Sequence, residues 1–154
     1  LAASRFIPHP PNFTSLLALS FYIPVILGLR YLPALIACFI ITDLFIGFHG
    51  VILFTWGSAF LVGLSSLYFK KNIKNRMFGA LFGACIFFIV TNFGVWSLGS
   101  YGYTVKGLLT SYTLALPFFG NTLVSTIIFS AIIEFVIERK IFIKKTFSRI
   151  NLTR

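Results

Sequence analysis

Few side chains in this sequence of 154 residues could carry out chemistry, and most of them lie among apolar neighbours. The chain has only three acidic residues, two histidines and two cysteines. Asp43 lies inside an apolar run, where an unpaired carboxylate costs ~2.5–3.5 kcal/mol on membrane-insertion scales. We therefore expect Asp43 to be protonated or paired with Arg5 or His49, and its position favours a functional role.

These residues form no recognisable catalytic or metal-binding pattern. The sequence has no HExxH motif, phosphate-binding glycine-rich loop or GxSxG nucleophile elbow. Three acids and two histidines leave few candidates for acid–base catalysis, and no cysteine or further histidine accompanies the two histidines as a metal ligand. We therefore expect no enzymatic activity, no catalytic residue, no metal site and no cofactor.

Polar and turn-forming residues gather in four short motifs. Residues 5–14 read RFIPHPPNFT, residues 42–49 TDLFIGFH, residues 91–96 TNFGVW and residues 117–122 PFFGNT. Asn92 and Trp96 have helical i, i+4 spacing, so an amide and an aromatic ring share one face. From these motifs and the loop after them we predict a substrate-binding site formed by His9, Asn12, Asp43, His49, Asn92, Trp96, Tyr101 and Asn121.

Several of these features also have a purely structural interpretation. The prolines before Asn12 are typical of a rigid entry into a helix, with Asn12 as its N-cap. His9 is equally typical of a polar residue at a membrane surface, and Trp96 of an interfacial anchor. We expect Glu134 and Glu138 to pair locally with the basic residues that follow them.

The composition indicates the environment that positions these motifs. Apolar residues make up 58% of the chain and charged residues 10%, against typical values of ~45–50% and ~25%. So few charges could not cover the surface of a soluble domain, and 20 phenylalanines exclude disorder. Two cysteines exclude a disulfide scaffold. We predict one all-α membrane domain over residues 1–154, because an open sheet cannot satisfy its backbone in lipid.

The apolar runs predict five full membrane spans. Four runs, 13–29, 31–48, 51–69 and 77–98, approach the ~20 residues that a spanning helix needs. The fifth, 107–138, is too long for one span and too short for two. Pro117 favours a break, so we predict a short or re-entrant helix before it and a span over about 118–138. Gly79 and Gly83 form a GxxxG motif, which predicts close helix packing.

The positions of the basic residues predict how these spans are oriented in the membrane. If loop 70–76 lies in the cytoplasm, as the positive-inside rule asks, Arg30 and the basic tail 139–154 lie there too. The polar motifs then share the outer face, which predicts an outward-facing pocket. The net charge of +10 is thus a sign of topology, and the tail suits anionic lipid or a cytoplasmic partner rather than nucleic acid. The first residues, 1–4, fit a cleaved signal peptide or, as we favour, a sixth upstream span.

The motifs PHPPNFT (8–14), TNFGVW (91–96) and ALPFF followed by NT (115–122) resemble an uncharacterised bacterial family of small membrane proteins to which a transport role has been attached. This resemblance covers about residues 4–133 and implies a further N-terminal helix. The layout is in turn similar to the S components of energy-coupling-factor vitamin transporters, which have six helices, cytoplasmic termini and an outward pocket. Where biotin S components carry a Gly-Asp pair and a lysine, this chain has Asn121, Thr122 and Ser125, so biotin is not implied.

Two functions follow as expectations. In the first, the chain is a substrate-binding subunit of a bacterial transporter for a small, vitamin-like solute in the cytoplasmic (inner) membrane. Because it has no ATPase motif, it would need ATP-hydrolysing and transmembrane coupling subunits as partners, in addition to membrane lipids. In the second, it is an accessory structural subunit of a larger membrane complex.

Overall fold

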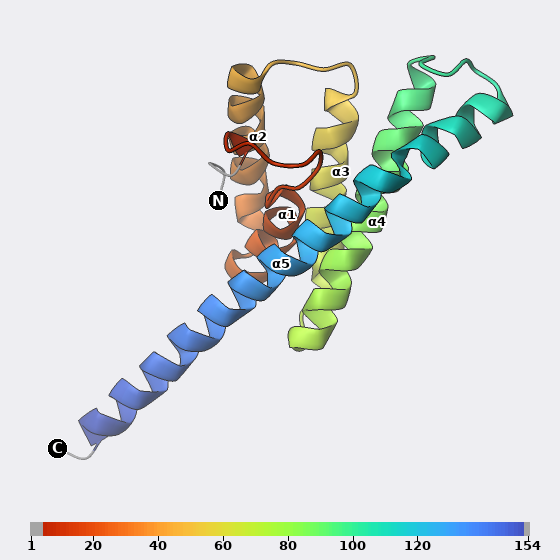
Figure 1. Cartoon of the computed structure of the whole chain (residues 1–154). Coiled ribbons are helices and arrows are strands. Elements are labelled where there is room, and N and C mark those ends of the chain that lie inside the picture. The colour runs from red at the N-terminus through yellow and green to blue at the C-terminus, as the bar shows by residue number, and fades with distance from the viewer. Residues whose placement is uncertain (1–4, 153–154) are drawn as a thin grey trace.

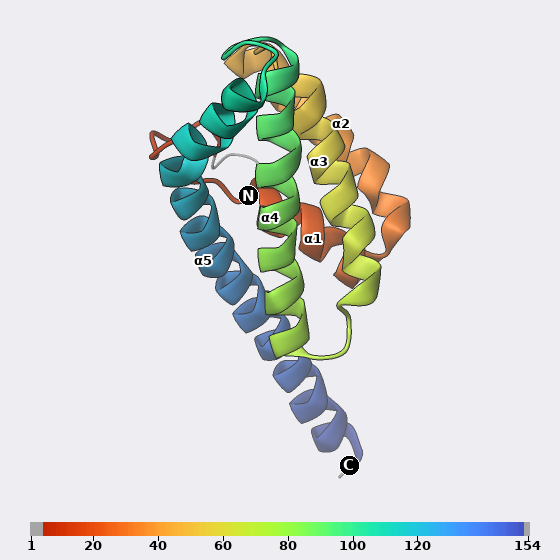
Figure 2. The same ribbon diagram turned by 90° about the vertical axis from the view of Figure 1, so that its right-hand side faces the viewer.

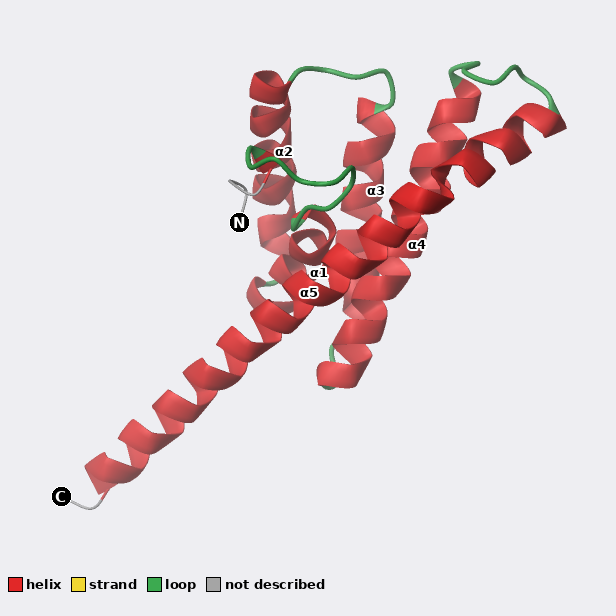
Figure 3. Ribbon diagram, in the orientation of Figure 1, coloured by secondary structure: helices red, strands yellow, loops and turns green. Residues whose placement is uncertain are grey.

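The computed structural model describes the backbone of residues 5–152 and the side chains of residues 5–140. Residues 1–4 and the end of the basic tail at 153–154 lie outside the described residues, as does the upstream span that we expected. The described part consists of helices joined by loops and contains no strand, which confirms the predicted all-α class (Figure 3). Its helices are α1 (Leu16–Leu27), α2 (Leu32–Ile46), α3 (Ile52–Ser65), α4 (Ile73–Ser97) and α5 (Val105–Leu152).

Three of the described helices are long and apolar enough to cross a membrane. They are Leu29–Ile46, which includes a 3-10 turn before α2, then Ile73–Ser97 and Val105–Lys140. Two shorter apolar helices, Leu16–Leu27 and Ile52–Tyr68, accompany them. A helix of 12 residues such as α1 is about 18 Å long, against a hydrocarbon core of ~30 Å. The chain therefore has the character of a membrane protein, and the count of five full spans stays a prediction.

Helix α1 forms the centre of the bundle and is steeply inclined to the other helices. It is seen nearly end-on in Figure 1, whereas α2, α3 and α4 run up and down the page. Its residues are apolar on all sides, which is typical of a helix surrounded by others. Phe21 and Tyr22 are almost completely buried and pack in a cluster with Phe39 of α2 and Val62 of α3.

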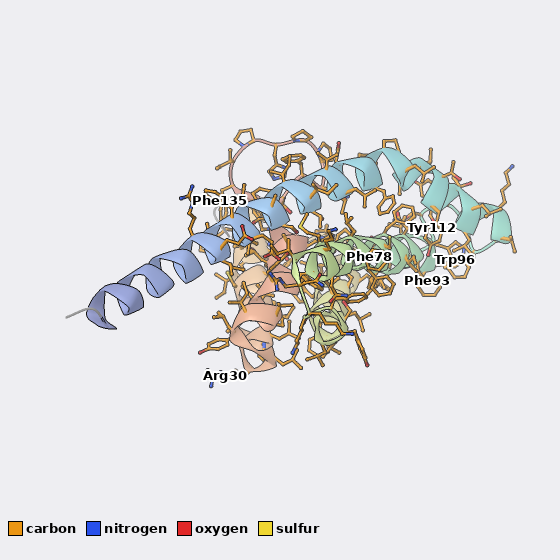
Figure 4. The ribbon with its side chains drawn as sticks, turned by 90° about the horizontal axis from the view of Figure 1, so that it is seen from below. Arg30, Phe78, Phe93, Trp96, Tyr112 and Phe135 are labelled. Carbon is orange, nitrogen blue, oxygen red and sulfur yellow. The ribbon has the colours of Figure 1, made fainter. Side chains whose placement is uncertain are left out.

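The predicted helix break at Pro117 is wrong, because α5 continues through this residue. Instead of ending at Pro117, α5 bends in its first part, which follows loop 98–104 (Figure 4). A bend relieves the clash between a proline ring and the preceding turn, and an uninterrupted helix leaves fewer backbone groups unpaired in an apolar environment. Tyr112, in the first part of α5, donates a hydrogen bond of 2.8 Å to the Ile89 carbonyl of α4 and so joins the two helices.

The bundle has two chemically different ends. Connections 28–31 and 69–72 and the C-terminal part of α5 lie at the lower end in Figures 1 and 2. We call this the basic end, because Arg30, Lys70, Lys71, Lys74 and Arg76 lie in or next to these connections. Connections 47–51 and 98–104 lie at the opposite end, which holds His49, Tyr101 and the end of α4. This arrangement brings the polar motifs at 42–49 and 91–96 to one end of the bundle.

Candidate functional site

A cavity of about 370 Å³ lies between segment 5–15 and the helices around it. It is lined by the start of α1, the end of α2, the connection to α3, the C-terminal half of α4 and the middle of α5. Its volume falls at the lower end of the ~300–1,000 Å³ typical of small-molecule sites. The polar residues that line it are Arg5, His9, Asn12, Thr14, His49, Thr55, Thr91, Asn92, Thr122 and Ser125.

Segment 5–15 is attached to α2 through a buried ion pair. The Arg5 guanidinium donates to Thr42 Oγ1 and forms a salt bridge with Asp43 Oδ1. The other carboxylate oxygen of Asp43 accepts a 2.7 Å hydrogen bond from Trp56 Nε1 of α3. Asp43 is only 1% exposed, so its charge needs these partners. Of the two predicted alternatives, Arg5 is the partner and His49 is not.

The other end of the segment is attached to α5. Asn121 Nδ2 donates to the Pro11 carbonyl at 3.1 Å, and Ser125 Oγ approaches the Asn12 carbonyl at 3.5 Å. Asn12 adopts a φ of 62°, a left-handed conformation in which asparagine is enriched. The interpretation of Asn12 as an N-cap is wrong, because α1 begins at Leu16 and Asn12 instead turns the chain across the cavity. The segment therefore joins α2 to α5 over the site.

Most hydrogen-bond donors around the cavity are already engaged by backbone carbonyls. Three threonine hydroxyls and the Asn92 amide each donate to the carbonyl four residues earlier in their own helix or its first turn. The distances are 3.3 Å for Thr55 to Val51, 2.8 Å for Thr91 to Phe87, 2.9 Å for Thr122 to Phe118 and 2.7 Å for Asn92 to Phe88. These side chains keep oxygen lone pairs, so they present acceptors to the cavity, and the Asn92 amide keeps one further N–H donor.

His9 has the same character. Its Nδ1 lies 2.8 Å from the Pro10 carbonyl oxygen, which can only accept a hydrogen bond. Nδ1 therefore carries a proton, and in the neutral ring Nε2 is left with a lone pair. The result is a further acceptor on a residue that lines the cavity.

Aromatic rings form much of the apolar wall. Phe88 of α4 and Phe119 of α5 have ring centroids 4.5 Å apart with an interplanar angle of 32°. Phe88 also meets Tyr112 edge to face at 5.5 Å. Phe87 and Phe118 line the cavity beside them. Rings in such positions offer their faces and edges to a ligand that is itself aromatic.

The structure brings together half of the predicted site residues and separates the others. His9, Asn12, His49 and Asn92 line the cavity. Asp43 lies behind Arg5, and Asn121 holds the Pro11 carbonyl, so both support the site without lining it.

Trp96 and Tyr101 do not line the cavity. Trp96 donates through Nε1 to the Thr104 carbonyl at 3.1 Å and so closes loop 98–104. It lies at the end of α4 next to Phe93, with which its ring packs at 5.5 Å (Figure 4). The prediction that Asn92 and Trp96 would face one site is therefore wrong, because Trp96 turns toward its own loop.

Sequence reasoning missed the rings of Phe88 and Phe119 and the hydroxyls of Thr91, Thr122 and Ser125 as cavity-lining groups. One signal was present. Polar residues recur on α5 at helical spacing, at Thr122, Ser125, Thr126, Ser130 and Glu134, and all of them are buried. Such a stripe in an apolar helix marks the face that turns inward.

The expected local pairing of Glu134 is also wrong. Glu134 forms a bidentate ion pair with Arg76 of α4, with distances of 2.7 Å from Nε to Oε1 and 2.6 Å from Nη2 to Oε2. Tyr22 of α1 donates to the same carboxylate at 2.9 Å. This group joins three helices near the basic end, and Arg76 is not a residue that lines the cavity. Among the described residues, no three His, Cys, Asp or Glu side chains lie together as a metal site.

Together these features define an all-helical protein with three candidate membrane spans and a mixed polar and aromatic cavity at the end opposite the basic residues. Residues 1–143 match a protein family described as a family of unknown function (DUF6580), and the chain belongs to this family. No curated protein and no solved structure matches the chain. The relation to energy-coupling-factor S components is therefore a proposal.

Proposed function

We propose that this chain is the substrate-binding membrane subunit of a bacterial transporter for a small, vitamin-like solute. The observation that carries the proposal is the cavity of about 370 Å³, with apolar walls and a few placed polar groups. That composition is characteristic of small-molecule sites. The attachment of segment 5–15 at both ends gives the site a preformed roof, which lowers the ordering cost of binding.

The orientation in the membrane is part of the same proposal. Lysines and arginines concentrate at the basic end, and by the positive-inside rule this asymmetry supports a cytoplasmic position for loop 70–76 and the tail from 139 in the bacterial inner membrane. Segment 5–15 and α1 together then lead from the outer side to the cytoplasmic side, with α1 steeply inclined to the other helices, and α2 to α5 cross the bilayer in turn. The cavity opens away from the cytoplasm, where it can capture a solute before partner subunits hydrolyse ATP to move it.

The direct test is ligand binding to the purified protein. We expect at least one compound from a panel of vitamins and their precursors to raise the melting temperature, because a ligand that binds only the folded state stabilises it. Copurified ATPase subunits would add support. If every compound leaves the melting temperature unchanged and the protein copurifies with a larger complex without an ATPase, the accessory-subunit function is favoured instead.

A matched pair of variants assigns the binding to the cavity. Thr122→Val removes a hydroxyl that lines the cavity, and Thr113→Val removes one with the same bond to its own helix on an exposed part of α5. The loss of one hydrogen bond of ~0.5–1.5 kcal/mol predicts about two- to tenfold weaker binding in Thr122→Val only. Titration calorimetry with the stabilising compound measures this, and equal effects of both substitutions would place the ligand elsewhere.

The proposed orientation predicts the accessibility of two loops. Single cysteines at Asn72 and Ser100, in a background without Cys38 and Cys85, should react with a membrane-impermeant reagent from opposite sides. Both positions are in exposed connections at the two ends of the bundle. Labelling of Ser100→Cys in intact cells, with Asn72→Cys labelled only after lysis, is the expected result. Labelling of both from one side would contradict the orientation.

A further inference from the structure

The charge that borders the cavity is already neutralised within the protein. Arg5 is the only Lys, Arg, Asp or Glu side chain among the described residues that line the cavity. Its guanidinium is bound to Thr42 and to the buried carboxylate of Asp43, whose second oxygen is bound to Trp56. Because an ion in apolar surroundings needs a counter-charge, an ionic ligand would find none free in this site.

Most of the hydrogen-bonding groups of the site offer acceptors, rather than donors, to a ligand. The hydroxyls of Thr55, Thr91 and Thr122 and the amide of Asn92 donate to carbonyls of their own segments. They therefore present oxygen lone pairs to the cavity, and the neutral ring of His9 presents a nitrogen lone pair. An anionic ligand, which only accepts hydrogen bonds, fits these groups poorly and is left with the second N–H of Asn92 and the donors of Asn12, Thr14 and His49. A ligand with N–H or O–H groups fits it well.

The walls restrict the shape of the ligand. Phe88 and Phe119 line the cavity, with ring centroids 4.5 Å apart and ring planes inclined by 32°, and Phe87 and Phe118 add two further rings. A flat ring packs on such rings by offset stacking or edge to face. The volume of about 370 Å³ favours a molecule of one or two rings.

We infer that the ligand is an uncharged, flat heteroaromatic molecule that donates hydrogen bonds through N–H or O–H groups. This inference rests on the proposed function and narrows it to one substrate class. It assigns Asp43 a positioning role, because Asp43 cancels the charge of Arg5 and thereby excludes anions. Removing the carboxylate should leave a free positive charge at the edge of the cavity.

Matched compounds of different charge test the inference. The probes are nicotinamide, nicotinate and the 1-methylnicotinamide cation, together with pyridoxine and adenosine and their 5′-phosphates. Binding to the wild-type protein is measured by calorimetry at pH 8. In the sets that bind, the uncharged member should bind at least tenfold more tightly than its charged counterparts. Tighter binding of a charged member would overturn the inference but leave the proposed function intact. If none of these probes binds, the inference is also overturned, and the vitamin panel with the copurified partners then decides the proposed function.

Asp43→Asn tests the role of the carboxylate. With Arg5 unneutralised, affinity for the anionic member of the set should rise on the order of tenfold, while affinity for the uncharged member changes by less than threefold. Glu138→Gln is the matched control, because it removes an exposed carboxylate outside the lining and should leave the selectivity unchanged. Unchanged affinity of Asp43→Asn for the anion would overturn the assigned role.

A double variant separates the loss of the carboxylate from the effect of an unpaired buried charge on folding. Arg5→Met combined with Asp43→Asn removes the ion pair as a neutral unit, so no unpaired charge is left buried. This protein should keep the preference for the uncharged probe and should not gain affinity for the anion. Loss of most binding of the uncharged probe, or a new preference for the anion, would mean that the selectivity has another origin and would overturn the inference.

Discussion

Replacing Gly83 with leucine is expected to prevent folding or to destabilise the protein by at least ~3 kcal/mol, the upper range for overpacked cores. A Cβ atom at Gly83 would lie only 2.7 Å from Val62 Cγ1, closer than real side chains approach. Val62 is completely buried in α3, so it cannot turn out to solvent to relieve the contact. Expression yield and the melting temperature in detergent measure the effect.

Three further variants isolate the cause. Gly57→Leu is the matched control, because Gly57 is an exposed helical glycine with no atom within 4 Å of an added Cβ. It should be neutral or slightly stabilising, since leucine favours a helix. Gly83→Ala should be destabilising alone and partly rescued by Val62→Ala, which removes the clashing methyl group and leaves the Cβ atom at 3.6 Å. A stable Gly83→Leu protein would mean that α3 and α4 do not meet in this way.

Much of the fold could be predicted from the sequence because membrane helices follow simple rules. Apolar length placed α2, α4 and the last helix, and small-residue spacing placed the contact at Gly79 and Gly83. The same rules overestimated α1, because a central helix can be short and apolar on every side. They also treated Pro117 as it would behave in water, although in an apolar environment the helix bends instead of ending.

The candidate site was predictable only in part, and the reason is the range of its contacts. Polar residues in an apolar chain are conspicuous, so His9 and Asn92 were found, and they line one cavity. Phenylalanine is too common here for Phe88 or Phe119 to stand out. The side chain of Trp96 was misplaced because a hydrogen bond to its own loop decides its direction, and no spacing rule predicts that bond.

The partners of the two buried acids show the same limit. Asp43 has Arg5 as its partner 38 residues away, and Glu134 has Arg76 at a separation of 58 residues. For Asp43 the sequence left open protonation or pairing with Arg5 or His49, and for Glu134 it indicated pairing with a cation nearby in the chain. For Glu134 the nearest cations along the chain were the wrong choice, because Glu134 is on the inward face of α5 and Arg139 is exposed. The helix face on which a buried acid lies therefore decides which cation it pairs with, and proximity in the sequence does not.

Glu134→Leu is expected to lower stability by about 3–5 kcal/mol, the cost of leaving one member of a buried ion pair without its partner. The change would strand the Arg76 guanidinium, whose side chain is 18% exposed, and would remove the acceptor of Tyr22 in the centre of the bundle. Arg76 cannot be deprotonated to escape this cost. Unfolding in a denaturing detergent, followed by circular dichroism, provides the measurement.

The ion pair itself is expected to contribute less than its disruption costs. Replacing both partners, as in Arg76→Met with Glu134→Leu, removes charge and counter-charge together and should recover most of the lost stability. Glu138→Gln removes an exposed carboxylate one helical turn later and should have no measurable effect. If the double variant were as unstable as Glu134→Leu, the bond from Tyr22 would be the main contribution, and the group would hold α1 rather than join α4 to α5. Wild-type stability of Glu134→Leu would contradict the buried ion pair altogether.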